Sequence, residues 1–373
     1  MKIAIDARMY GNEECTGIGT YIKNLTDNLF RIDENNEYII FLREPEFSKF
    51  TPPNERVAKV KVSARWYSYA EQFVLPFQLT KEKFDLIHYP HFNSPIFFPK
   101  KSICTIHDVT PLSFPGHKMS SIIRRLGYKA VFNATLRKVA TIIAVSNNTK
   151  QEIIKHFNVN PKKIVITHEG VDERFKIIDD CDIISKVKTQ FGLAKPYIFY
   201  VGVWRSHKNI EGLVKTFNLL KKKYNLPHQL VLGGREDLHY TLVRNAINES
   251  PFKNEIITLG YVADNQLPIL YNAADVFVLP SFIEGFGLIA IEAQSCGCPV
   301  ASTNTSSMPE VLGNSALFFN PYNHEEMAEQ IYQILSNEKL RQELIAKGLE
   351  NVKRFSWRQC AEETLKVYCN LQS

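Results

Sequence analysis

Two glutamates, Glu284 and Glu292, lie eight residues apart across the glycine-rich run 285–288. The stretch 275–280 before them reads as a short buried strand closed by a proline, and a helix pattern begins at the end of the run. A helix start offers free backbone N–H groups and positive dipole character, which suit a phosphate oxygen. The spacing therefore predicts a phosphate cradle with an acid on each side.

The two carboxylates cannot bind the phosphate themselves, because like charges repel. They suit neutral groups rich in hydroxyls, such as a sugar and a ribose on either side of a diphosphate. This favours a nucleotide sugar as the ligand. A purely structural role is the alternative, because glycine-rich strand-to-helix turns are common in doubly wound proteins and glutamate is frequent in a first helical turn.

A second cluster follows the predicted strand 197–201, where Arg205 and Lys208 stand between Gly202 and a predicted helix. Basic side chains at such a place can neutralise a departing diphosphate, as a glycosyl or phosphoryl leaving group requires. Ordinary surface cations are the alternative. That alternative loses weight because the glycine, the strand end and the cations coincide.

Glycines also follow other predicted strands. Gly17 and Gly19 come after the first strand and before the first predicted helix, and they allow a ligand to approach the backbone. They do not form a dinucleotide fingerprint, because Ile22 stands where the third glycine belongs. Later strand-end turns are predicted as walls for a nucleobase, at Gly233, Tyr261 and Val262.

A histidine and an aspartate, His107 and Asp108, stand at the end of the predicted strand 102–107. The histidine could donate to a substrate hydroxyl, act as an acid or base, or be structural. His88 and His91 are not predicted to bind metal, because the proline between them prevents a helix that would align the rings. The acids within 180–182 read as solvated charge. We therefore predict no metal site.

Strand and helix patterns alternate from end to end, which predicts an α/β protein with parallel sheets. A break over 172–195 holds an acidic cluster and no strand pattern. We predict a first domain over 1–171, a linker over 172–195 and a second domain over 196–356, and the helix at 357–373 could pack back on the first. The predicted strands are 2–6, 38–42, 85–88, 102–107, 141–146, 163–167, 197–201, 229–232, 255–259, 276–279, 300–302 and 316–319.

The bulk composition is that of a globular protein, with 373 residues, 45% of them hydrophobic. This length favours two domains. Apolar runs are too short for a membrane span, and the N-terminus has no signal-peptide pattern. The seven cysteines show no Cys-x-x-Cys pair. This argues against a zinc site or disulfide framework and predicts a reducing cytoplasm.

The net charge of +6 is unevenly distributed, because residues 109–151 contain no acid but several lysines and arginines. Within this stretch, apolar residues interleave with the basic ones at helical spacing over 118–138. A solvated helix face is one interpretation. The other is a surface that meets anionic lipid or an anionic acceptor, on the inner face of the cytoplasmic membrane. No nucleic-acid motif is present, so nucleic acid is not expected as a partner.

Together these motifs resemble the retaining glycosyltransferases of family 4, which include bacterial mannosyl- and glucosyltransferases. The resemblance covers nearly the whole chain and is densest over 271–281, 284–287 and 297–300. It implies the GT-B fold, in which two doubly wound, Rossmann-like domains face a cleft. It also implies that a hexose passes, with retention, from a nucleotide-diphosphate sugar to a hydroxyl of a glycan or lipid-linked acceptor in cell-surface polysaccharide synthesis.

The resemblance also implies roles for residues. Glu284 would contact donor sugar hydroxyls, Glu292 the ribose and Lys208 the diphosphate, while His107 would lie near the reacting face of the sugar. Arg205 is expected to supply the second diphosphate cation, in place of arginines that relatives carry nearby. The other residues implied to lie near the sugar or phosphates are Gly17, Gly19, Gly285, Phe286, Gly287 and Leu288.

GDP-mannose is the first expectation for the donor, followed by UDP-glucose and UDP-N-acetylglucosamine, with no metal or other cofactor. Other functions stay open. A nucleotide-sugar epimerase or a phosphorylase would keep the fold, although a phosphorylase would require a pyridoxal lysine and usually a longer chain. A non-catalytic glycan- or membrane-binding protein is another alternative. A nicotinamide oxidoreductase is weakened by the missing third glycine.

Overall fold

The structure is a computed structural model that describes residues 1–11, 16–116 and 121–372. It divides into two compact units. Unit 1 comprises Met1–Gly170 and Ser356–Ser373, and unit 2 comprises Val171–Phe355. Within the described residues, no helix is both long and apolar enough to cross a membrane.

Unit 1 is built on a seven-stranded sheet with the order β3-β2-β1-β4-β5-β6-β7. Every neighbouring pair is parallel, and most strand residues are buried because helices cover the sheet. The strands are β1 Lys2–Asp6, β2 Glu37–Leu42, β3 Val57–Lys61, β4 Leu86–Tyr89, β5 Ser102–Ile106, β6 Thr141–Ala144 and β7 Ile164–Ile166.

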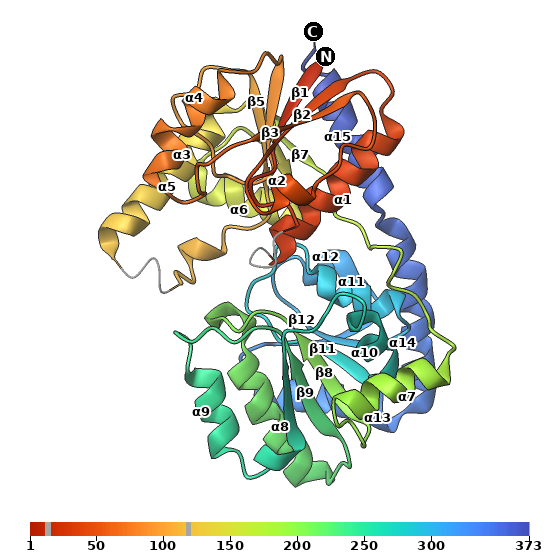
Figure 1. The fold of residues 1–373 in the computed structure, drawn as a ribbon. Coiled ribbons are helices and arrows are strands. Elements are labelled where there is room, and N and C mark those ends of the chain that lie inside the picture. Colours follow the sequence, from red (N-terminus) through yellow and green to blue (C-terminus); the bar gives the residue numbers. More distant parts are fainter. Residues whose placement is uncertain (12–15, 117–120, 373) are drawn as a thin grey trace. The chain divides into compact units, whose positions relative to one another are not determined.

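The C-terminal helix of the chain belongs to unit 1 and packs against the first helix (Figure 1). His88 in β4 forms buried hydrogen bonds to the Tyr368 hydroxyl (2.7 Å) and to Thr105 Oγ1 (2.8 Å). Burial lowers the pKa of this imidazole to about 3, so its role here is structural. The α-helices are α1 Thr16–Ile32, α2 Glu46–Lys49, α3 Tyr69–Phe73, α4 Leu75–Leu79, α5 Ile122–Lys138, α6 Asn147–Phe157 and α15 Trp357–Cys369.

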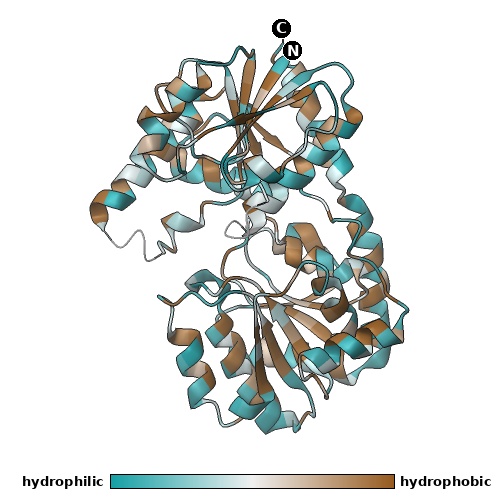
Figure 2. Cartoon of the chain, viewed as in Figure 1, coloured by the Kyte–Doolittle hydropathy of each residue, from teal (hydrophilic) through white to brown (hydrophobic). Residues whose placement is uncertain are grey.

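Unit 2 has a six-stranded sheet in the order β10-β9-β8-β11-β12-β13, again with every neighbouring pair parallel. Its central strands are entirely buried, and Figure 2 shows hydrophobic residues concentrated in the strands of both units. The strands are β8 Tyr197–Val201, β9 Gln229–Gly233, β10 Ile256–Gly260, β11 Val276–Leu279, β12 Val300–Thr303 and β13 Ala316–Phe319.

Residues 172–195, predicted as a linker, group with unit 2 and contain a helix that packs against α10. Asp180 caps this helix, because its carboxylate accepts hydrogen bonds from the N–H groups of Asp182 and Ile183. The helices of unit 2 are α7 Cys181–Gln190, α8 Ile210–Tyr224, α9 Leu242–Glu249, α10 Leu267–Ala273, α11 Leu288–Ser295, α12 Met308–Leu312, α13 His324–Ser336 and α14 Glu338–Asn351.

The prediction of two doubly wound parallel sheets is confirmed. The sequence did not predict one strand, β3, which lies at the edge of the first sheet. Its sequence alternates apolar residues with Lys59 and Lys61, and it is only half-buried. An edge strand needs no continuous apolar run, because one side faces solvent and lysines protect its unpaired edge.

Candidate active site

The loop between β11 and α11 requires glycine. Gly287 has φ of +83°, and a Cβ at this position would lie 2.3 Å from Met308 Cε. Any other residue would therefore clash and be strained. Helix α11 begins at Leu288, and no side chain caps it. The Ala290 N–H donates to the Gly287 carbonyl at 2.9 Å, whereas the N–H groups of Leu288 and Ile289 have no hydrogen bond to a described residue and are available to an acceptor from outside the helix.

Glu284 is held in place by several hydrogen bonds. Its two carboxylate oxygens accept from the Lys208 ammonium at 2.7 and 2.9 Å, and Oε1 also accepts from the Ser281 hydroxyl at 2.6 Å. Its backbone N–H donates to Ser306 Oγ (2.9 Å), and its carbonyl accepts from Ser307 Oγ (3.0 Å). The side chain is nearly buried. The carboxylate is therefore fixed in position.

Lys208 lies in a short 3₁₀ turn, Ser206–Lys208, after the end of β8. The next residue, Asn209, is left-handed with φ of +52°, and its side-chain amide donates to the Pro280 carbonyl at 3.1 Å. The Phe282 N–H donates to the His207 carbonyl at 2.8 Å. These bonds tie the loop after β8 to the loop after β11, so Lys208 and Glu284 are positioned together.

The neighbouring residues His207 and Arg205 differ from Lys208. Burial, together with the charges of Lys208 and Arg205, lowers the pKa of His207 to about 3, so its ring is neutral. Arg205 is exposed, and its side chain has no hydrogen bond or ion pair within the described part of the chain. The geometry therefore positions Lys208 firmly and leaves Arg205 unconstrained.

Glu292 lies on α11, one turn after Leu288, and is buried. Its Oε2 accepts a long hydrogen bond from the Tyr271 hydroxyl at 3.4 Å. Burial raises the pKa of this carboxyl to about 7, although the charge of Arg174 opposes the shift. Arg174 itself is paired with Asp264 at 3.0 Å. No lysine or arginine in the described residues contacts Glu292.

The predicted nucleobase walls lie at the ends of β9 and β10. A Cβ at Gly233 would come within 3.2 Å of the side chains of Val201 and Val262, so the backbone is closely packed there. Tyr261 is half exposed, and the Arg235 guanidinium lies 5.0 Å from its ring centroid. This is cation–π distance.

These residues share one edge of the sheet. Strands β10, β9, β8 and β11 are consecutive neighbours and run parallel, so their carboxyl ends meet. Lys208, Glu284, Gly233 and Tyr261 follow or end these strands. The structure therefore brings the predicted residues of unit 2 to one edge, as expected for ligand binding in a doubly wound sheet.

In unit 1, His107 follows the end of β5. Its Nδ1 lies 2.9 Å from Glu169 Oε1, and its Nε2 lies 2.9 Å from the Pro90 carbonyl oxygen. Burial lowers the pKa of His107, but the hydrogen bond and charge of Glu169 outweigh it and raise that pKa above its ordinary value. Both ring nitrogens face oxygen acceptors, an arrangement that favours the protonated form of the ring. Neither nitrogen is free to act as a base while these contacts hold.

Gly17 and Gly19 lie in the first turns of α1, whereas the sequence placed them in a loop before the helix. Gly17 is exposed, and a Cβ there would meet no described atom within 4 Å. Nothing in unit 1 itself therefore requires glycine at position 17. Cys15, at the start of this motif, is outside the described residues, as are the first three residues of the predicted basic segment 118–138.

Some residues of the site had no assigned role from the sequence. Glu169 pairs with His107 across 62 positions, and Tyr271 reaches Glu292 across 21. Contacts between residues so far apart in the sequence leave no local sequence pattern from which they could be predicted. Ser281, in contrast, stands three residues before Glu284, a spacing at which a turn can bring a hydroxyl to a carboxylate.

Comparison with known proteins identifies the family. The descriptions "Glycosyltransferase Family 4" and "Glycosyl transferases group 1" match residues 16–175 and 183–351. The O-antigen chain mannosyltransferase B of Escherichia coli is 32% identical, over 76% of this chain and 74% of that protein. This chain belongs to glycosyltransferase family 4.

Two further proteins are similar to this family 4 glycosyltransferase, one in sequence and one in structure. The serotype-specific mannosyltransferase WbdA of Escherichia coli is 28% identical over 73% of this chain, which spans only 34% of that longer protein. The structure of Anabaena HepE in complex with UDP and glucose matches with a TM-score of 0.80 and 16% identity, over 99% of this chain and 100% of HepE. The predicted family and the GT-B fold are thus confirmed.

Proposed function

We propose that this glycosyltransferase moves mannose from GDP-mannose to a hydroxyl of a glycan or lipid-linked acceptor in cell-surface polysaccharide synthesis. Two relatives named as mannosyltransferases support the sugar. The complex of HepE with UDP and glucose supports a nucleotide-diphosphate sugar as the donor class. UDP-glucose and UDP-N-acetylglucosamine are the next candidates.

The observation that carries the proposal is the fixed pair of Glu284 and Lys208 at the end of β11. The carboxylate can accept hydrogen bonds from sugar hydroxyls without any change in its charge. The ammonium has three N–H donors, of which two point to Glu284. The third N–H can bind a diphosphate oxygen. Glu284 would then contact the sugar of the donor, and Lys208 would contact its diphosphate.

The surrounding residues complete the donor site. Glu292 would bind the ribose hydroxyls, and the N–H groups of 285–288 would approach the sugar and phosphate. Gly17 and Gly19 would lie beside the phosphates, while the walls at the ends of β9 and β10 would face the nucleobase. His107, as an imidazolium, would stabilise negative charge near the reacting face of the sugar rather than remove a proton.

We further propose that transfer proceeds with retention and without a metal. The acceptor oxygen bonds to the anomeric carbon on the face that the diphosphate leaves, and the departing phosphate oxygen takes the acceptor proton. No enzymatic base is then required, in keeping with the engaged nitrogens of His107. Lys208, Arg205 and the start of α11 would offset the charge of the leaving group.

Peripheral contact with a membrane is proposed for the start of α5. Ile122, Ile123 and Leu126 are 73%, 80% and 62% exposed, and they alternate with Arg124 and Arg125. Exposed apolar side chains among cations suit anionic lipid. Flotation with phosphatidylglycerol vesicles checks this. We expect binding that is lost in Ile123→Glu; equal binding to phosphatidylcholine vesicles would contradict the electrostatic part.

The function is tested by incubating the protein with each candidate donor and a mannose-ended oligosaccharide, followed by NMR of the product. The proposal predicts a new α-linked mannose from GDP-mannose. A change of the donor sugar without any acceptor would identify an epimerase. Binding of a nucleotide sugar, seen as a rise in melting temperature, without turnover would identify a non-catalytic protein.

A further inference from the structure

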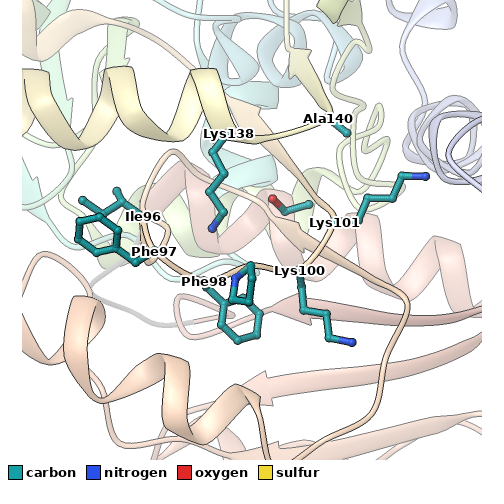
Figure 3. A pocket seen from close by; sticks show the side chains of 9 residues that line it. Ile96, Phe97, Phe98, Lys100, Lys101, Lys138 and Ala140 are labelled. Carbon is teal, nitrogen blue, oxygen red and sulfur yellow. The ribbon is translucent and has the colours of Figure 1, made fainter.

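Unit 1 contains a cavity of about 350 Å³ at the edge of its sheet opposite His107. The cavity lies beside Ser102, the first residue of β5, whereas His107 follows the last residue of that strand. Segment 96–101 and the end of α5 form its walls. Figure 3 shows the Lys138 side chain extending from the end of α5 toward the segment that carries Phe97 and Phe98. The cavity is therefore separate from the candidate active site.

The cavity is strongly basic. Lys100, Lys101 and Lys138 line it, and none of the nine described lining residues is acidic. Each ammonium donates to a backbone carbonyl, Lys138 to Pro95 at 2.8 Å. The carbonyl partners of the other two are Phe84 at 3.3 Å and Leu371. Within residues 1–11, 16–116 and 121–372, no carboxylate pairs with any of these three lysines.

The three lysines differ in exposure. Lys138 is partly buried, whereas Lys100 and Lys101 are exposed. Burial lowers the pKa of Lys138 to about 8, because its ammonium loses water without gaining an anion. A ligand with negatively charged oxygens would supply that anion.

We propose that this cavity binds a phosphate group through Lys138, with Lys100 and Lys101 adding positive charge on its wall. Its volume falls in the range of small-molecule pockets, so it accommodates a phosphate together with a small organic group. Phe97 on its wall is 84% exposed. An exposed ring beside cations suits a phospholipid headgroup, and a free phosphate ester is the other source of the same chemistry.

The first test is a lysine footprint on the intact wild-type protein. An amine-reactive label is applied with and without inorganic phosphate at constant ionic strength, and labelling of each lysine is read by mass spectrometry. We expect phosphate to slow labelling of Lys138 several-fold. The exposed lysines Lys186, Lys222 and Lys339 serve as internal controls. Equal effects of phosphate on both groups would overturn the proposal.

A matched pair of variants gives the second test. K100Q/K101Q/K138Q removes the charges of the cavity, and K186Q/K222Q/K339Q removes the same number elsewhere. Both are made with Lys208→Gln, so that phosphate binding in the active site is weakened equally. We expect about tenfold or weaker phosphate binding in the cavity variant alone. Equal affinity in the two variants, both folded by circular dichroism, would refute the site.

The source of the phosphate is decided by repeating the footprint with glycerol 3-phosphate and with phosphatidylglycerol or phosphatidylcholine vesicles. Protection by phosphatidylglycerol vesicles at concentrations where glycerol 3-phosphate has no effect supports a lipid headgroup. Protection by glycerol 3-phosphate alone supports a free ester. Protection by neither overturns the proposal. With Lys208 restored, the cavity variant should transfer sugar to a soluble acceptor at the wild-type rate, so failure here leaves the proposed function intact.

Discussion

Glu284 and Glu292 belong to the same loop and helix and are equally buried, at 8% and 9% exposure, yet their surroundings differ. Glu284 contacts an ammonium and a hydroxyl within 2.9 Å. Glu292 has a single phenolic partner at 3.4 Å, and among the described residues no cation touches it. The protein thus neutralises one acid of the pair and leaves the other to its ligand.

This difference indicates what each acid is for. Because Glu284 is already paired with Lys208, it can accept hydrogen bonds from neutral hydroxyls while it holds the Lys208 ammonium in place to contact a phosphate. Burial raises the pKa of Glu292 to about 7, so keeping it ionised at neutral pH costs folding stability. A buried acid that destabilises the folded protein in this way indicates a role in ligand binding.

The largest expected effect is that of Glu284→Gln. The amide keeps the shape but loses the charge that orders Lys208 and binds sugar hydroxyls. We expect kcat/KM to fall by roughly 100- to 1000-fold, with the circular dichroism spectrum unchanged. The exposed Glu350→Gln, on α14, is the control for removal of one carboxylate. Near-normal turnover of Glu284→Gln with the correct substrates would remove this residue from the mechanism.

Lys208→Gln should be next in size, with kcat/KM about 10- to 100-fold lower, because one charge-assisted contact to the diphosphate is lost. If the two residues act as one unit, the double variant E284Q/K208Q should be little worse than E284Q alone. Fully multiplied losses in the double-mutant cycle would show that the two groups act independently.

Glu292→Gln tests the difference between the two glutamates through the unfolding free energy of the protein. A folded pKa of about 7 lies above the ordinary value of 4.5, so the carboxyl's stabilising contribution is complete below pH 4.5 and is lost as pH rises through 7. The amide does not titrate. Relative to wild type, the variant should therefore gain on the order of 2–3 kcal/mol in unfolding free energy between these pH values.

Denaturant unfolding at pH 4.5, 6 and 8 measures this gain. Glu350→Gln should stay within about 0.5 kcal/mol of wild type at each pH, because its carboxylate is exposed. We also expect transfer by Glu292→Gln to fall about tenfold, less than for Glu284→Gln. A stability difference independent of pH would mean that Glu292 is ionised and compensated in the folded protein.

The positions of most candidate site residues in unit 2 could be predicted from the sequence. Lys208, Glu284, Gly233 and Tyr261 follow or end strands, and parallel topology brings carboxyl ends to one edge. Glycine at 287 marked a turn whose left-handed backbone would strain any other residue. Local patterns therefore suffice where a residue's place depends on the strand it follows.

Contacts between distant segments could not be predicted. The pairing of His107 with Glu169 joins segments 62 residues apart, and it occupies a ring nitrogen that a catalytic base would need. The start of α1 was also placed too late, because Gly17 and Gly19 do not look like helix formers. Composition fixes neither a tertiary hydrogen bond nor a helix boundary set by packing.

The smallest expected effect is that of a chelator. If Glu284 were a metal ligand, the ammonium at 2.7 Å would compete with the ion for the same carboxylate oxygen. With Lys208 there, the charge of the leaving diphosphate can be offset without a metal. We therefore expect the transfer rate in EDTA to stay within about twofold of the untreated rate. Complete loss, restored by a divalent ion, would show that Lys208 does not suffice and that the pairing seen at Glu284 is broken when the donor binds.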